Sequence, residues 1–135
     1  MDRDALQVML DAAPYHQVVR MVVEEVDAEA GRFVLRLPFQ PNLQRVPDAP
    51  QVHGGPIASV IDTAGTFAVV ATVGHGVPTI NLRIDYLRPA IDTDLVATAT
   101  VRRVGRTVAV CDVDLTDDQG RLVAVGRGTW GTAAG

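Results

Sequence analysis

The stretch 56–73 is the part of the sequence that most constrains the fold, because it is long and almost entirely apolar. It reads PIASVIDTAGTFAVVATV, and from Ile57 to Val73 its only ionisable side chain is Asp62. A helix that is apolar on all sides has to be buried on nearly every side. Because an unpaired carboxylate is costly to bury, Asp62 needs either a partner or a function.

The length and composition indicate one domain, residues 1–135, with a core large enough to bury such a helix. The stretch 56–73 also contains a serine and three threonines, so a membrane span is not expected. The N-terminus lacks the basic start and continuous apolar core of a signal peptide. With a single cysteine, Cys111, the chain has neither an intramolecular disulfide nor a cysteine-cluster metal site. These features predict a cytoplasmic protein.

The charge distribution argues against nucleic acid as a partner. The formal net charge is −4, and the only dense basic group is Arg102, Arg103 and Arg106. No aromatic residues interleave with these arginines, as they would in a nucleic-acid surface. We interpret the group as the solvated end of a hairpin, with a phosphate anchor as the alternative, since guanidinium groups fit phosphate oxygens.

Periodicity and turn residues divide the rest of the chain into short elements. Residues 39–52 contain three prolines and no period, which predicts a long loop. Apolar and polar residues alternate in the strand 79–87, with Ile80, Leu82, Ile84 and Tyr86 on one face and Thr79, Asn81, Arg83 and Asp85 on the other. The expected helices are 4–12 and 56–73, and the expected strands are 17–27, 32–38, 79–87, 95–104, 107–115 and 122–130.

This order predicts an α+β fold with an antiparallel sheet. The last four strands follow one another, and the connections at 105–106 and 117–120 are short enough for hairpins. A curved sheet wrapped around the apolar helix would bury it. Because such a sheet leaves open edges, we expect a dimer.

Two motifs resemble those of the hotdog-fold acyl-CoA thioesterases of the phenylacetate-pathway and 4-hydroxybenzoyl-CoA type. They are HGGPIASVIDTAG at 53–65 and VPTINLRIDYLRPA at 77–90. The resemblance implies the hotdog fold, a curved antiparallel sheet around one long central helix. It also implies homodimers with sites at the interface, dimers of dimers, and hydrolysis of medium-chain or aromatic acyl-CoA. No metal or separate cofactor is implied, because coenzyme A is part of the substrate.

The resemblance also assigns roles to particular residues. Asp62 falls on the catalytic carboxylate, which acts as nucleophile or general base. Gly54 and Gly55 fall on the segment whose backbone N–H groups polarise the thioester carbonyl. The implied substrate contacts are His53, Gln51, Thr79, Asn81 and Arg83, with the Thr79 hydroxyl also helping to position water.

The chain departs from the family pattern in the loop before the HGG motif. Some relatives carry Asn or Gln six residues before the histidine, where this chain has Pro47. Gln51 is the nearby amide that we nominate for that role.

The spacing of the motif residues supports a shared site. On a helix, Gly54 and Asp62 are ~12 Å apart along the axis, too far to act on one carbonyl. Two such helices paired antiparallel in a dimer would bring the carboxylate of one subunit to the glycines of the other.

Two alternative functions remain at the level of sequence. The chain could be a non-catalytic module that binds acyl thioesters, with Asp62 in a structural role. It could be a hydratase or dehydratase that uses His53 as a base. His53 could instead be a packing and hydrogen-bonding residue that shapes the start of the helix, which is the interpretation we prefer.

Overall fold

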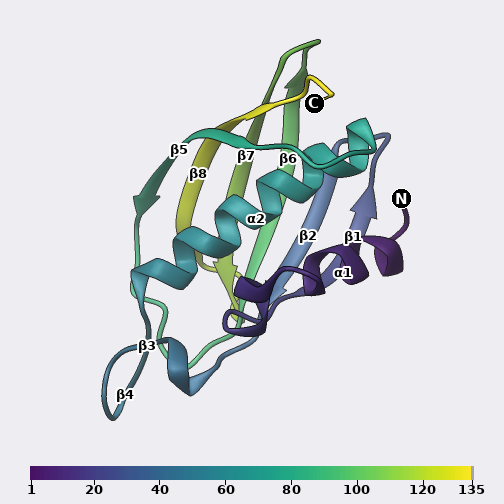
Figure 1. Ribbon diagram of the computed structural model, residues 1–135. Coiled ribbons are helices and arrows are strands. Elements are labelled where there is room, and N and C mark those ends of the chain that lie inside the picture. The colour runs from purple at the N-terminus through teal and green to yellow at the C-terminus, as the bar shows by residue number, and fades with distance from the viewer. Residues whose placement is uncertain (135) are drawn as a thin grey trace.

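The computed structural model describes residues 1–134, which form one large sheet, one small sheet and a long central helix (Figure 1). The helical elements are α1 (Arg3–Asp11), η1 (Pro14–Gln17), η2 (Pro41–Leu43) and α2 (Gly54–Val73). The strands are β1 (Val22–Asp27), β2 (Arg32–Leu37), β3 (Gln44–Val46), β4 (Ala49–Val52), β5 (Thr79–Tyr86), β6 (Leu95–Val104), β7 (Val108–Asp117) and β8 (Leu122–Gly131).

The large sheet has the strand order β1-β2-β6-β7-β8-β5, and every neighbouring pair is antiparallel. It curves around α2, while α1 lies beside the β1 end of the molecule (Figure 1). The predicted α+β class is therefore confirmed, with a curved antiparallel sheet around one central helix. The strands β1 and β5 are the two edges of this sheet.

The bounds of α2 follow from its capping residues. His53 has an extended backbone and caps the N-terminus, and Gly74 ends the helix in the left-handed conformation with φ 83°. By length and composition α2 could cross a membrane, and among residues 1–134 it is the one helix with this property. Here it is the core helix: ten of its twenty residues are buried, and all but two of the others are partly buried.

Glycines make room for large side chains between α2 and the sheet. A Cβ atom on Gly65 of the helix, or on Gly128 of β8, would overlap the ring of the fully buried Trp130. A Cβ on Gly126 would overlap the Ile61 side chain in the same way. The glycines thus form slots for large side chains, and the helix–sheet distance is set by what fills them.

Two sequence-based expectations about local structure were wrong. Residues 17–21 are not part of a strand, because Pro14 starts the 3-10 turn η1 and the Gln17 side chain donates to the Asp11 carbonyl. Residues 39–52 are not an irregular loop, since they form η2 and the β3–β4 hairpin. Asp48 makes this hairpin possible with a positive φ of 61°, a conformation that aspartate tolerates in turns.

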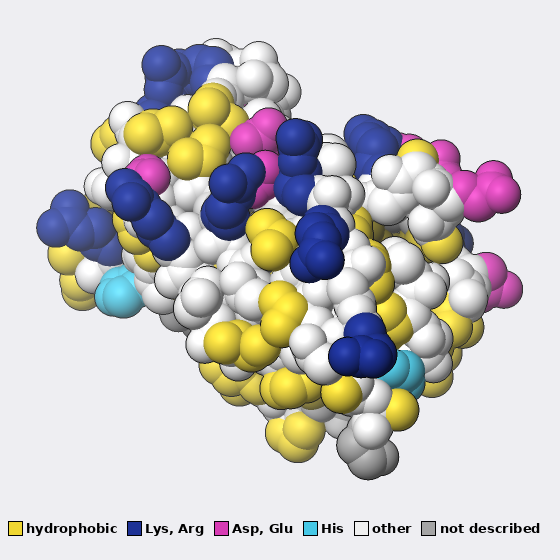
Figure 2. Space-filling model, turned by 90° about the horizontal axis from the view of Figure 1, so that it is seen from above, with side chains coloured by type: hydrophobic (Ala, Val, Ile, Leu, Met, Phe, Trp, Pro, Cys, Tyr) yellow, Lys and Arg dark blue, Asp and Glu magenta, His cyan; other side chains and the backbone are white. Residues whose placement is uncertain are grey.

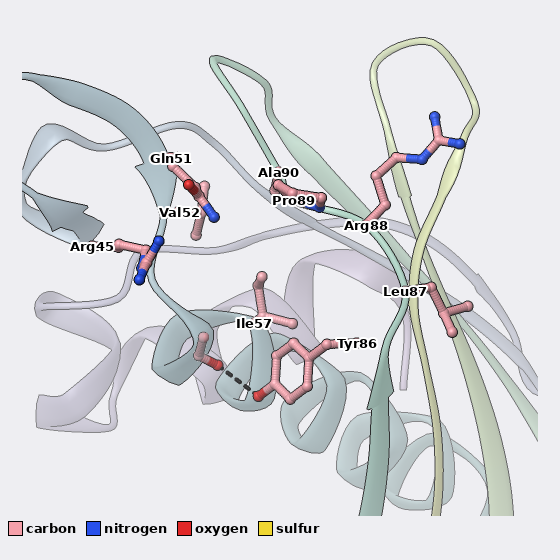
Figure 3. Close-up of a pocket in the computed structure, with 10 residues that line it drawn as sticks. Arg45, Gln51, Val52, Ile57, Tyr86, Leu87, Arg88, Pro89 and Ala90 are labelled. Carbon is pink, nitrogen blue, oxygen red and sulfur yellow. Dashed lines mark hydrogen bonds between the residues drawn. The ribbon is translucent and has the colours of Figure 1, made fainter.

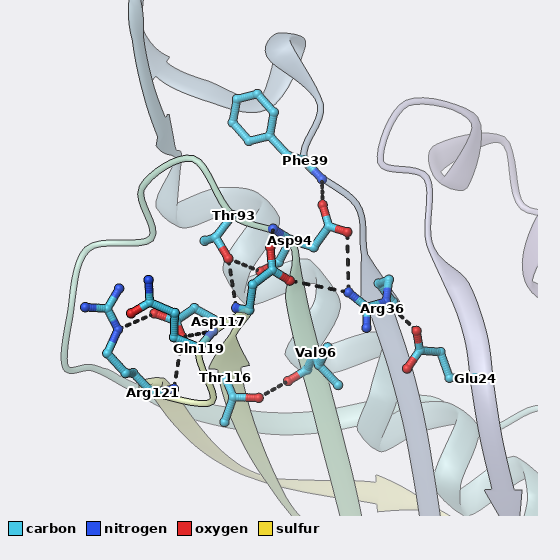
Figure 4. Close-up of polar contacts among 11 residues, drawn as sticks. Glu24, Arg36, Phe39, Thr93, Asp94, Val96, Thr116, Asp117, Gln119 and Arg121 are labelled. Carbon is cyan, nitrogen blue, oxygen red and sulfur yellow. Dashed lines mark hydrogen bonds and ion pairs between the residues drawn. The ribbon is translucent and has the colours of Figure 1, made fainter.

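Carboxylates hold the connecting segments in place at the end of the sheet where β2 ends and β6 begins (Figure 4). Asp94 accepts the Phe39 N–H at 2.7 Å and pairs with Arg36 at 3.3 Å, and Arg36 also binds Glu24. The segment that leaves β2 is thus fixed to the start of β6.

Asp117 organises the turn between β7 and β8 in a similar way. Its buried carboxylate accepts the N–H groups of Gln119 and Arg121, both at 2.9 Å, and pairs with the Arg121 guanidinium at 2.8 Å. Burial alone would raise the pKa of this carboxyl, but these donors outweigh it and hold the pKa below its usual value.

We therefore expect Asp117→Asn to destabilise the protein in a pH-dependent way. Because the pKa of Asp117 is lowered on folding, its contribution is fully present above about pH 4 and is lost as the pH falls through the folded value. Thermal unfolding should show a lower Tm for the variant at pH 7 and a difference that shrinks toward pH 2. Asp114→Ala, on the exposed face of β7, is the control. A deficit that is constant with pH would contradict the assignment.

Candidate active site

Asp62 lies in the middle of α2 and faces the edge strand β5. Its side chain is half-buried, and its Oδ1 accepts a hydrogen bond of 2.7 Å from the Thr79 hydroxyl. No arginine or histidine among residues 1–134 forms an ion pair with it. The carboxylate therefore keeps partial access to solvent and one neutral donor, which leaves its charge free to act on a substrate.

Thr79 reaches Asp62 because of an irregularity in β5. Thr79 lies opposite Trp130 while Asn81 lies opposite Thr129, so Ile80 is an extra residue in this strand. A bulge of this kind breaks the alternation of side chains and turns Thr79 toward the helix. The alternating pattern had placed Thr79 on the same face as Asn81, and this expectation was wrong.

The N-terminus of α2 forms the second part of the candidate site. His53 Nδ1 accepts the Gly55 N–H at 2.8 Å, while the Gly54 N–H has no partner among the described residues. The Tyr86 hydroxyl donates to the Gly54 carbonyl at 2.8 Å. A neutral His53 that accepts at Nδ1 carries its proton on Nε2. The residue thus serves as a helix cap, and Gly54 offers the free backbone donor.

A pocket of 360 Å³ opens beside Gly54, between β4 and the segment that follows β5 (Figure 3). Gln51 and Arg45 line one side of it, and Tyr86, Leu87 and Arg88 line the other. Neither arginine has an ion-pair partner among the described residues. Gln51, our nominee for the role of the amide that Pro47 replaces, therefore lies at the pocket, while Pro47 lies at the hairpin turn.

Within one chain, Asp62 and Gly54 of α2 contact opposite ends of the edge strand β5. Thr79, which begins β5, contacts Asp62, and Tyr86, which ends β5, contacts Gly54. The residues assigned from the resemblance thus form two separate groups that do not meet in a single subunit.

Two other groups of candidate residues lie outside the Asp62 and Gly54 clusters. Asn81 and Arg83 are exposed on the outer face of β5, where Arg83 approaches Asp85 at 3.4 Å, and their role as substrate contacts stays a prediction. Arg102, Arg103 and Arg106 lie at the β6–β7 turn, at the end of the sheet away from Gly54 (Figure 1). Figure 2 looks down on that end and shows arginine side chains spread over it.

Several residues belong to the core rather than to the site. Phe67 is buried and stacks on Phe33 at a centroid distance of 6.1 Å, as part of the hydrophobic core. Burial, assisted by the charge of Asp112, raises the pKa of the Cys111 thiol to about 12, which makes this cysteine unreactive. Within residues 1–134, no cluster of His, Cys, Asp and Glu is arranged to hold a metal.

Sequence reasoning missed the residues that hold the two clusters in place. Tyr86 was assigned only to an apolar face, although its hydroxyl binds the Gly54 carbonyl. Thr66 donates to the Asp62 carbonyl at 2.8 Å and accepts from the Trp130 indole N–H at 2.8 Å. The i, i+4 spacing of Asp62 and Thr66 could have suggested the first of these bonds, but nothing in the sequence pointed to Trp130.

Comparisons with known proteins give the family. The family model described as thioesterase superfamily matches residues 50–124. The human protein named acyl-coenzyme A thioesterase 13 is 30% identical over 131 residues, which cover 94% of this chain and 91% of that one. The Escherichia coli medium/long-chain acyl-CoA thioesterase YigI is 28% identical and covers 87% and 84% of the two chains. The E. coli PaaI protein from the phenylacetic acid degradation operon superposes with a TM-score of 0.84, at 25% identity over 98% of this chain and 93% of that one.

The central helix, the wrapped sheet and these matches define a hotdog-fold enzyme, as the sequence motifs predicted. The chain belongs to the thioesterase superfamily. It is a thioester hydrolase.

The role of His53 as a helix cap leads to a test. Asparagine is also a good N-cap acceptor, so we expect His53→Asn to keep the Tm and to keep kcat within about tenfold of the wild-type value. Thermal unfolding and steady-state hydrolysis measure the two quantities. A loss of about a hundredfold in kcat with an unchanged Tm would instead identify His53 as a proton-transfer group.

Proposed function

We propose that the chain is an acyl-CoA thioesterase in which Asp62 is the nucleophile or general base and the backbone amides of Gly54 and Gly55 polarise the thioester carbonyl. The observation that carries this proposal is the unpaired, half-buried Asp62 carboxylate, held by Thr79 at the open edge of the sheet. The names of the human and E. coli relatives support acyl-CoA as the substrate.

As a general base, Asp62 would take a proton from a water molecule while the water oxygen forms a bond to the carbonyl carbon. The carbonyl oxygen becomes an oxyanion, which a free N–H at a helix N-terminus stabilises. Collapse of this intermediate breaks the C–S bond, and the thiolate takes up a proton. As a nucleophile, a carboxylate oxygen of Asp62 would bond to the carbonyl carbon while the C–S bond breaks and coenzyme A leaves as a thiolate that takes up a proton. Water would then hydrolyse the resulting mixed anhydride to the free acid and restore the Asp62 carboxylate.

The Gly54 N–H is the better placed of the two donors, because His53 already accepts from Gly55. Gly55 would contribute only when its N–H is shared between the His53 ring and the substrate oxygen. Thr79, by donating to one carboxylate oxygen, leaves the other directed at water or substrate.

The active form that we propose is a homodimer joined through β5. This strand is an unpaired edge, and Ile80 and Leu87 are 57% and 56% exposed on or beside it. Exposed, apolar edge strands are ready to pair with a second chain. If β5 paired antiparallel with its counterpart about a two-fold axis, the Asp62 end of one subunit would lie beside the Gly54 end of the other.

This arrangement would produce two identical composite sites for each dimer. The separation of the two clusters along β5 within one chain supports it, because the distance between them is otherwise too long for one reaction centre. Pairing of dimers into tetramers and a cytoplasmic location stay predictions.

The pocket beside Gly54 offers a place for the coenzyme A part of the substrate. Arg45 lines it, and Arg88 lies at its rim with its side chain directed away from Gln51 (Figure 3). Neither has a carboxylate partner among the described residues, so both are available to a ligand that carries phosphate groups. We propose medium-chain or aromatic acyl groups, in line with the names of YigI and of the PaaI operon. Release of free thiol from a panel of acyl-CoA thioesters would identify the preferred acyl group.

Hydrolysis should require the charge of Asp62 and not only its shape. Asp62→Asn keeps the size of the side chain, so we expect the same Tm and a kcat lower by about a hundredfold or more. Free-thiol detection with acyl-CoA measures this loss. A variant that keeps half of the wild-type rate would show that Asp62 is structural, and would favour a protein that binds thioesters without cleaving them.

Complementation between inactive subunits tests the composite site. Asp62→Asn subunits and Gly54→Val subunits should each be inactive alone, since valine adds a side chain next to the Tyr86 ring where the substrate would lie. Random exchange makes about half of the dimers mixed, each with one intact site, so about a quarter of the wild-type activity should return. Mass spectrometry confirms the exchange. Exchange without recovery would show that each chain builds its own site.

A further inference from the structure

We propose that Trp130 and Thr66 are positioning residues for Asp62: through Thr66, the Trp130 indole holds the helical turn of Asp62 at a fixed place relative to Thr79. We call these two side chains the Trp130–Thr66 relay. The inference rests on the proposed function, because it explains how the proposed carboxylate is aligned.

The relay consists of two hydrogen bonds of equal length. The Trp130 Nε1–H donates to Thr66 Oγ1 at 2.8 Å, and Thr66 Oγ1 donates to the Asp62 carbonyl oxygen at 2.8 Å. The Thr66 hydroxyl has only one proton to donate. Its orientation is therefore fixed, because it must accept from the indole and donate to the Asp62 backbone at the same time.

The same tryptophan is also linked to the other side of the Asp62–Thr79 contact. Trp130 on β8 is the residue directly opposite Thr79 on β5, where the bulge turns Thr79 inward. One residue thus has its backbone next to Thr79 and its side chain bonded to the helical turn that carries Asp62. The 2.7 Å hydrogen bond from the Thr79 hydroxyl to the Asp62 carboxylate completes the set of contacts that links Trp130 to both residues.

The indole has little freedom to move. It is fully buried, and the absence of side chains at Gly65 and Gly128 makes the slot that it fills. A buried indole N–H needs an acceptor, and Thr66 is the acceptor that the structure supplies. A rigid ring that is hydrogen-bonded to Thr66 can thus fix both the distance of α2 from the sheet and the rotation of the helix about its axis at Asp62.

A second threonine on α2 separates this role from ordinary helix geometry. Thr72 Oγ1 donates to the Ala68 carbonyl at 3.0 Å, the same i to i−4 bond that Thr66 makes to Asp62. Thr72 is exposed and accepts no indole N–H. Thr72→Val is therefore a matched control for the loss of a threonine bond within the helix.

The test compares Thr66→Val, which removes the hydroxyl at constant volume, with Thr66→Ser, which restores it, and with Thr72→Val. Misplacement of a reacting group by a fraction of an ångström lowers the rate of the chemical step more than it weakens substrate binding. We expect kcat with acyl-CoA to fall about tenfold in Thr66→Val with KM little changed, and to stay near the wild-type value in the other two. Thermal unfolding of each variant is measured alongside, and a lower Tm in Thr66→Val follows from its unpaired indole N–H.

A double-mutant cycle separates positioning from a general effect on folding. If the relay acts on the contact between Asp62 and Thr79, the Thr66→Val loss in kcat should largely disappear when Thr79 is already Val. If Thr66→Val does not fold, Thr66→Ala carries the same cycle, since its smaller side chain leaves room for a water molecule at the indole.

Wild-type kcat in Thr66→Val, or a loss that is fully additive with Thr79→Val, would overturn the relay and leave the proposed function standing. A wild-type protein that hydrolyses no acyl-CoA would overturn the proposed function and the relay together. A serine variant as slow as the valine variant would also overturn the relay, because the hydroxyl would not be the active element.

Discussion

The contact of the Trp130 ring with Gly65 and Gly128 is the constraint on which the rest of the structure depends. A side chain at either glycine would overlap the ring, so the helix and the sheet can reach their observed distance only with these residues. The large ring then fills the space between the two layers at full burial. Because this contact fixes both the distance of α2 from the sheet and the rotation of the helix about its axis, Asp62 faces β5 while ten other residues of the helix are buried in the core.

The edge strand β5 connects this packing to the proposed catalytic groups. Its first residue holds the Asp62 carboxylate and its last residue holds the Gly54 carbonyl, so one strand connects both halves of the proposed machinery. The strand is also unpaired on its outer side. An active site divided between the ends of an open edge strand favours assembly by a two-fold axis, since antiparallel pairing exchanges the ends.

The polar contacts of the fold are divided between two tasks. At the end of the sheet that carries the β7–β8 turn, Asp94 and Asp117 satisfy backbone N–H groups and arginines, which fixes connections that have little apolar surface (Figure 4). Around α2, by contrast, two groups keep the capacity to form further polar contacts. Asp62 has no cationic partner and the Gly54 N–H has no acceptor among the described residues, as a site prepared for a substrate requires.

The sequence by itself determined the central helix, the order of the strands along the chain and the antiparallel class, and it singled out Asp62 and the glycine pair as candidates for the site. These follow from local patterns: an apolar run of fixed length, alternation, short turns and one charge out of place. The tertiary structure decided that Thr79 points inward, that His53 occupies the Gly55 N–H, that Gln51 reaches the pocket and that Trp130 bonds to Thr66. The bulge in β5 and the bond between Trp130 and Thr66 both depend on residues far apart in the chain, in the second case by 64 positions. Local patterns fix which face a residue favours, but only the packed sheet fixes register, bulges and the partner of a buried indole.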